Sequence, residues 1–221
     1  MNDQNLRTGP KGLDTQQIVE TAVAVLEEGG EEGFSVRKLA ARVGCDPMAV
    51  LYHFGNKKGL ERAIAEWLNG QITLKGVGEP WDSRLMALAM AYRALALQYP
   101  GSFPLLLRFW TTGPADLRLA EYAYVAFAEA GHSDTDVVDL CLGWYAGILG
   151  LAAADAGGLL RPAADARQAL SVLDPLLFPM TSRLRTRLEQ QGDRNVYERF
   201  ASLLVQAVKK PRGGKHRLGR R

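Results

Sequence analysis

The chain has 221 residues, of which 47% are hydrophobic and 23% are charged, a balance typical of folded globular proteins. Its two cysteines, Cys45 and Cys141, lie in no Cys/His cluster, which argues against a disulfide framework and a zinc site. The first 17 residues lack the apolar centre of a secretory signal, and the longest uncharged run, 140–154, is too short to cross a bilayer. We therefore expect a cytoplasmic protein with no metal, no other cofactor and no membrane partner.

Positive charge is concentrated in two segments, although the net charge is only +3. Residues 1–70 carry eight Lys and Arg against ten Asp and Glu, but within 35–62 six basic residues face only Asp46 and Glu61. This segment concentrates charge where a DNA contact needs it. Residues 209–221 carry seven basic residues and no acidic one, so they either add sequence-independent phosphate contacts or form a solubilising tail.

Helical periodicity runs through the whole sequence, and we find no alternating pattern typical of a strand. The sequence therefore predicts an all-α protein. The turn-forming stretch 75–80 predicts a domain boundary. We divide the chain into a disordered arm (1–13), an N-terminal helical domain (14–74), a larger helical domain (80–209) and a basic, disordered tail (210–221).

Short polar residues and glycines mark the helices of the N-terminal domain. Asp14, Ser35 and Asp46 are typical N-cap residues, and Pro47 suits the first helical position. Gly44 ends the second helix. The expected helices are 14–29, 35–43, 46–54 and 56–72.

The second and third helices, joined by a short turn at Gly44, have the arrangement of a helix-turn-helix. In this motif the second helix of the pair enters the major groove of DNA. Val50 and Phe54, four residues apart, should face the core. The outward positions are then Met48, Ala49, Leu51 and Tyr52. Apolar side chains there suit thymine methyl groups, although any pair of short helices in an all-α protein produces similar spacing.

Other side chains are placed to contact the DNA backbone. Ser35 opens a helix whose N-terminal amides can hold a phosphate. Arg37 can reach a base or the backbone. Lys57, His53 and the hydroxyl of Tyr52 are placed for further phosphates.

The segment 34–44 (FSVRKLAARVG) followed by 49–60 (AVLYHFGNKKGL) resembles the N-terminal signature of the TetR family of repressors. The match covers residues 14–62, and its Tyr-His-Phe-x-x-Lys ending is specific. The resemblance implies an all-helical homodimer, usually a repressor that a small ligand releases from operator DNA. It also implies that the DNA-facing or phosphate-contacting residues include Arg37, Met48, Tyr52, His53 and Lys57. Leu51 departs from the tyrosine of many members, so the operator sequence does not carry over.

The larger domain is expected to consist of helices interrupted by prolines and glycines. Their predicted ranges are 81–98, 103–111, 115–130, 134–156, 166–190 and 194–209. Pro175 and Pro179 should kink or split the fifth of these helices. The domain is rich in aromatic residues, which suit an apolar pocket but also an ordinary core. We assign the pocket to Phe103, Leu106, Trp110, Tyr124 and Trp144.

Two helices carry stripes that suit close packing. In the helix 134–156, the small residues Gly143, Gly147, Gly150 and Ala154 share one face. Each such glycine costs about 1 kcal/mol relative to alanine, so close approach of another helix is a physical reason for them. The last helix carries a stripe of Val196, Phe200, Leu203 and Ala207. In TetR-like dimers the last two long helices of each subunit form a four-helix bundle, so we assign both stripes to the dimer interface; packing within one subunit is the alternative.

Other functions have weaker support in the sequence. His132 lies near Asp134 and Asp136, but Ser133 followed by Asp136 is a helix-start pattern, which favours a cap over a metal site. His216 belongs to the basic tail, where we expect it to be solvated. The chain has no GxSxG, HExxH, GxGxxG or P-loop motif, which argues against an enzyme such as a small hydrolase.

The sequence therefore predicts a homodimeric repressor released from double-stranded operator DNA by a small apolar or aromatic molecule. The alternative is a helical interaction protein with a vestigial DNA-binding module.

Overall fold

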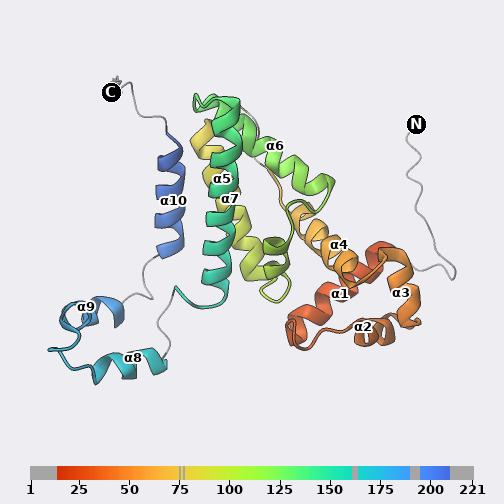
Figure 1. Cartoon of the computed structure of the whole chain (residues 1–221), viewed down its shortest axis with the longest axis horizontal. Helices are drawn as coiled ribbons and strands as arrows, with labels where there is room; N and C mark the ends of the chain where they lie inside the picture. The colour runs from red at the N-terminus through yellow and green to blue at the C-terminus, as the bar shows by residue number, and fades with distance from the viewer. Residues whose placement is uncertain (1–13, 75, 77, 161–163, 190–194, 210–221) are drawn as a thin grey trace, which may run out of the picture.

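A computed structural model describes residues 14–74, 76, 78–160, 164–189 and 195–209. Over these residues it contains ten α-helices, one 3₁₀ helix (η1) and no strand (Figure 1). The all-α prediction is confirmed. The predicted arm at 1–13 and the tail at 210–221, with His216, lie outside the described residues.

The N-terminal helices begin where short polar side chains cap them. The four helices are α1 (Thr15–Gly29), α2 (Val36–Val43), α3 (Pro47–Phe54) and α4 (Lys57–Gly70). Asp14, Ser35 and Asp46 accept hydrogen bonds from first-turn amides at 3.0, 3.1 and 2.7 Å, as the sequence predicts. Asn56 caps α4 in the same way, at 2.9 Å from the amide of Gly59. Helix α4 ends at Gly70, slightly earlier than expected.

The turn between α2 and α3 depends on Gly44. Its φ of 79° lies in the left-handed region, which glycine adopts without steric cost, and its amide donates back to Ala40. The turn brings the buried side chains of Leu39 and Val50 into one core with α1 and α4. The spacing of α2 and α3 is thus fixed by a glycine and a shared apolar contact.

The second half of the chain is built around α7 (Asp134–Ala156). Helix α7 packs against α5 (Trp81–Gln98), α6 (Pro114–Glu129) and α10 (Val196–Val208). Over the described residues, α7 is also the helix long and apolar enough to cross a membrane by length and composition. Because a core helix passes the same test, and α7 buries Trp144 and Ile148 against its neighbours, its packing agrees with the predicted core helix.

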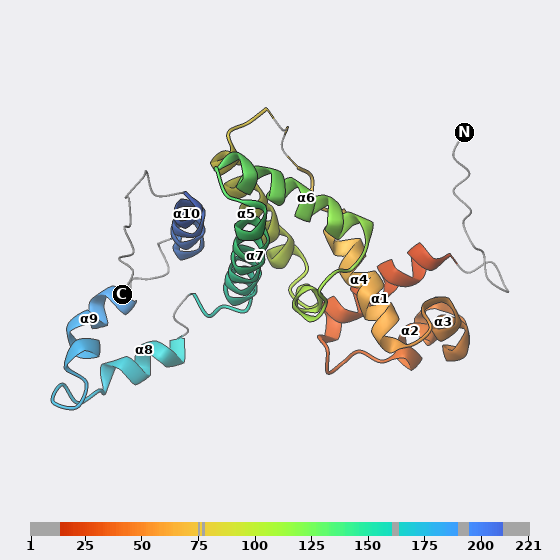
Figure 2. The same ribbon diagram turned by 45° about the horizontal axis from the view of Figure 1, so that its top comes forward.

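Two predicted helices differ in the structure. The segment expected as a helix over 103–111 is a 3₁₀ helix, η1, that ends at Arg108 (Phe103–Arg108). It begins at Phe103-Pro104 without a side-chain cap, so little stabilises a regular α-helix there. The segment 166–190 forms two helices, α8 (Ala164–Ser171) and α9 (Pro179–Glu189), as the prolines predict. Figures 1 and 2 place α8 and α9 together at the end of the molecule opposite α1–α4.

The two halves are joined at the end of α1 by a half-buried carboxylate. Glu27 accepts hydrogen bonds from the amides of Gly101 and Ser102, at 2.9 and 2.8 Å, and from the hydroxyl of Ser102 at 2.6 Å. A Cβ on Gly101 would lie 2.3 Å from the carbonyl oxygen of Leu26, so only glycine permits this approach. This contact holds the N-terminal helices against the loop before η1.

We predict that Glu27→Ala lowers the free energy of unfolding by about 2–3 kcal/mol, because it leaves two part-buried amides without their charged acceptor. The measurement is urea unfolding followed by circular dichroism. Glu20→Ala is the matched control, since Glu20 lies on the same helix and accepts one exposed hydrogen bond from Gln16. Equal unfolding midpoints for the two variants would contradict the role of Glu27.

Candidate nucleic-acid interface and buried cavity

Helix α3 presents one side to solvent and the other to the core. Met48 and Tyr52 are 69% and 74% exposed, and Val50 is fully buried. Ala49 and Leu51 are half-buried, so the outward placement predicted for these two residues holds only in part. Phe54 packs against the core as expected. A large apolar and a large aromatic side chain thus project from one short helix.

Exposed polar and basic side chains surround α3. Ser35 and Arg37 are exposed at the start of α2, and Arg37 forms no ion pair within the described ranges. Lys57 is exposed at the start of α4, and His53 is half-buried at the end of α3. Three helices therefore contribute the eight residues that the sequence assigned to DNA: Ser35, Arg37, Met48, Ala49, Leu51, Tyr52, His53 and Lys57.

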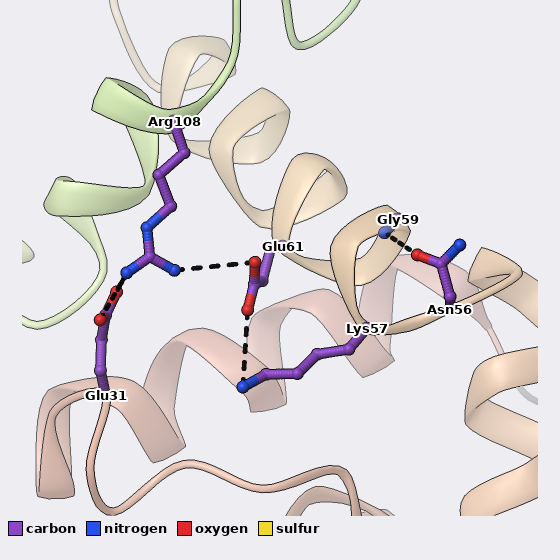
Figure 3. Close-up of polar contacts among 6 residues, drawn as sticks. All are labelled: Glu31, Asn56, Lys57, Gly59, Glu61 and Arg108. Carbon is purple, nitrogen blue, oxygen red and sulfur yellow. Dashed lines mark hydrogen bonds and ion pairs between the residues drawn. The ribbon is translucent and has the colours of Figure 1, made fainter.

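An ion-pair network links Lys57 to the second half of the molecule (Figure 3). The ammonium of Lys57 lies 3.7 Å from one carboxylate oxygen of Glu61, and Arg108 lies 3.7 Å from the other. Arg108 also pairs with Glu31, after α1. Arg108 of η1 thereby connects the turn after α1, through Glu31, with α4, through Glu61.

A cavity of about 80 Å³ lies between α5, α6, α7 and the loop before α6. Its wall includes Trp110, Tyr124 and Trp144, three of the five predicted pocket residues. Trp110 is 81% exposed, so it lies where the wall meets solvent. The volume is below the roughly 300–1,000 Å³ typical of ligand sites, so a drug-sized ligand would have to widen the cavity.

Phe103 and Leu106 do not line this cavity, which corrects the prediction. Both belong to η1, where side chains three residues apart lie above one another on one face. That face is buried, with Phe103 1% and Leu106 2% exposed, and η1 packs against α4 and α7. Aromatic and apolar character alone did not separate these core residues from the residues that line the cavity.

The sequence reasoning also missed a buried acid in the cavity wall, Asp116. Its carboxylate accepts hydrogen bonds from the side-chain amide of Asn69 and the backbone amide of Thr112, both at 3.2 Å. Burial raises the pKa of Asp116, and the nearby carboxylate of Glu66 adds to this, while hydrogen bonds from Thr111, Thr112 and Tyr145 oppose it. An acidic residue in the first turn of a helix is usually explained by its favourable interaction with the helix dipole. The position of Asp116 in the sequence therefore did not indicate a binding site.

Helix α4 caps the helix that carries Asp116. The N-cap of α6 is Gly113, which has no side chain, and Glu66 of α4 takes its place. Glu66 accepts hydrogen bonds from the amide of Ala115 at 2.6 Å and the hydroxyl of Thr112 at 2.8 Å. The cavity wall is therefore hydrogen-bonded directly to the helix that begins with Lys57.

The two predicted dimer stripes are largely accessible in the single chain. Gly143 and Gly150 are exposed, and a Cβ added at either would meet no atom within 4 Å, whereas at Gly147 it would lie 3.2 Å from Leu204 of α10. On α10, Phe200 is 50% and Leu203 49% exposed. The remaining stripe residues are Ala154 and Val196, both half-buried, and Ala207, which is exposed. Gly147 thus serves packing within the chain, whereas Gly143 and Gly150 remain accessible to another helix.

His132 has a structural role. Its ring nitrogen Nε2 hydrogen bonds to the carbonyl of Val208, and Ser133 caps α7 by accepting from the amide of Asp136. This confirms the predicted cap. No group of three His, Cys, Asp or Glu that could hold a metal ion occurs among the residues that the structure describes.

Comparisons with known proteins identify both halves of the chain. Residues 18–64 match the family model of the bacterial regulatory proteins of the tetR family, and residues 76–206 match the tetracyclin repressor-like C-terminal domain. The chain belongs to the TetR family of transcriptional regulators. It is 31% identical over 90 residues to the class D tetracycline repressor of Escherichia coli, a match that covers 39% of this chain and 41% of that protein. The chain thus spans about two fifths of the length of this curated relative.

Solved structures of TetR-family regulators share the fold over most of the chain. A candidate transcriptional regulator of Streptomyces coelicolor A3(2) is 25% identical, with a TM-score of 0.70 over 89% of this chain and 97% of that one. ActR of the same species, in complex with (S)-DNPA, is 16% identical, with a TM-score of 0.73 over 89% and 96%. BioQ with its double-stranded DNA operator is 19% identical, with a TM-score of 0.61 over 80% and 99%.

Proposed function

We propose that this TetR-family protein is a homodimeric repressor that binds operator DNA through α3 and is released by a small molecule bound in the cavity. The observation that carries the proposal is the outward side of α3, where Met48 and Tyr52 project from a capped helix-turn-helix. That BioQ, with the same fold, has been solved on its operator supports this use of the motif. An exposed recognition surface of this kind disfavours the alternative of a vestigial DNA-binding module.

The residues of this surface take distinct roles in the proposal. Met48, Ala49, Leu51 and Tyr52 meet base edges and sugars in the major groove, since these positions lie along the exposed or half-exposed side of α3. Ser35, His53 and Lys57 hold phosphates. Arg37 has no ion pair in the described chain, so it is free to reach a base edge or a phosphate.

A dimer is required because two recognition helices must enter successive major grooves, about 34 Å apart. We assign the interface to α7 and α10, where Gly143, Gly150 and Ala207 allow close approach and Phe200 and Leu203 offer apolar surface. All five residues are exposed in the single chain, as is expected for residues that pack against a second subunit. Two α7 and two α10 helices would then form a four-helix bundle.

The proposed release depends on α4. A ligand that widens the cavity displaces the start of α6, and Glu66 transmits this displacement to α4 because it caps α6. Helix α4 packs against α1 and α3, so α3 moves with it. The dimer would exist in two conformations that differ in the distance between its two α3 helices. The ligand shifts the equilibrium between them only as far as it binds one conformation more tightly than the other. That ActR has been solved with a small molecule supports a ligand in this fold.

The same proposal sets the protein's location and class. Operator DNA in a bacterium lies in the cytoplasm, so we place the protein there. We assign it no catalytic activity and no cofactor, because regulation by this route needs only differential binding of DNA and ligand.

We predict that Arg37→Ala and Tyr52→Ala each weaken binding to the operator at least about tenfold, the effect of losing one good base or phosphate contact. The measurement is fluorescence anisotropy with duplex DNA from the intergenic region beside the gene, in the presence of competitor DNA. Arg183→Ala, which removes an exposed arginine of α9, is the matched control and should bind as the wild type does. Selective binding that survives both substitutions would refute α3 as the reading helix.

We predict that Phe200→Glu converts the dimer to a monomer, because it places a charge at the centre of the proposed apolar interface. Sedimentation equilibrium measures the mass, and circular dichroism checks the helical content. Leu97→Glu is the matched control, since Leu97 on α5 is 46% exposed, close to the 50% of Phe200, and lies outside the proposed interface. A Phe200→Glu protein that stays dimeric would place the interface elsewhere.

A further inference from the structure

The described residues that form the cavity wall include an acidic side chain and no basic one. Of the described residues that line it, Asp116 is the acid, and no Lys, Arg or His accompanies it. The other ionisable lining groups are the phenols Tyr92, Tyr124 and Tyr145 and the thiol of Cys141. Burial raises the pKa of each of these four groups, so they are neutral at physiological pH.

Among the described residues, Asp116 has no positively charged partner. It is 9% exposed and forms no ion pair within the described residues. Its hydrogen bonds come from neutral groups, those of Asn69, Thr111, Thr112 and Tyr145. The charge that acts on it is that of Glu66, another carboxylate, which also forms no ion pair among the described residues. Nearby Arg62 lies over the ring of Phe109, 5.3 Å from its centroid. Two carboxylates therefore act on one another here, and neither has an ion-pair partner in the part of the chain that the structure describes.

Aromatic rings form much of the remaining wall. Tyr92, Trp110, Tyr124, Trp144 and Tyr145 all line the cavity. The rings of Tyr92 and Tyr145 meet edge to face, with centroids 5.6 Å apart. Aromatic faces attract organic cations, and this attraction is strongest where water is excluded. A carboxylate in an aromatic enclosure is the arrangement that recognises an ammonium group.

We infer that the effector is a hydrophobic organic cation, an aromatic amine whose protonated nitrogen pairs with Asp116 while its ring lies among the aromatic side chains. The inference specifies the ligand class of the function proposed above and rests on that proposal for its regulatory consequence. A carboxylate ligand would be repelled by Asp116 and Glu66. A neutral alcohol would donate one hydrogen bond to Asp116 but supply no countercharge.

Three probes of one shape test this preference: 2-naphthylmethylamine, 2-naphthylmethanol and 2-naphthoate. Each is titrated calorimetrically into the full-length protein at neutral pH, without DNA. We expect the amine to bind at least about tenfold more tightly than the alcohol, and the carboxylate to bind most weakly. An alcohol or carboxylate that binds as tightly as the amine, or an amine that fails to bind at millimolar concentration, would overturn the inference.

Asp116→Asn identifies the side chain responsible. It should reduce the preference for the amine over the alcohol to about twofold or less and leave the affinity for the alcohol nearly unchanged. Asp134→Asn makes the same charge change at an exposed position on α7 and should keep the wild-type preference. An Asp116→Asn protein that still prefers the amine would overturn the inference, and the wild-type series decides the question if this variant does not fold.

The titrations separate this inference from the regulatory function. Because they contain no DNA, a protein that binds the amine but no operator would contradict only the repressor proposal. A protein that binds its operator but prefers the carboxylate would contradict only the ligand class.

Discussion

Helix α4 belongs to both halves of the molecule, and the remaining structure depends on this sharing. Its apolar residues Leu60, Ile64 and Leu68 are fully buried, while Glu66 supplies the cap that Gly113 cannot give to α6. A helix N-terminus buried without such a partner would leave amides unsatisfied, so the contact is required for α6 to start where it does. The helix that begins with Lys57 therefore cannot move independently of the cavity wall.

Two further polar contacts define how the halves can move. Glu27 holds the loop of Gly101 and Ser102 through three hydrogen bonds, and the steric limit at Gly101 makes this contact short and specific. The ion pair of Arg108 with Glu61 is longer than its pair with Glu31, and both pairs are partly exposed to solvent. Each is therefore individually weak. In the proposed release, the Glu27 contact would therefore act as a fixed point, whereas the Arg108 contacts would re-form at little cost when α4 shifts.

The sequence predicted the fold well where local chemistry decides it. The caps at Asp14, Ser35 and Asp46 locate α1 to α3, because short polar side chains, proline and glycine act on the neighbouring backbone. It failed at η1, where Phe103-Pro104 begins a segment whose conformation is set by packing against α4 and α7. The expected outward side of α3 followed from the same local spacing, except that Ala49 and Leu51 are partly covered.

The cavity was the least predictable part, because its chemistry comes from residues far apart in the sequence. Asp116 alone is an ordinary first-turn acid; only folding brings Asn69, Glu66 and the aromatic ring of Tyr145 to it. Burial disfavours the charged form of this acid, and a cation in the cavity would favour it. Because no basic residue lines the cavity among the described residues, the cationic ligand inferred above would itself supply the countercharge to Asp116.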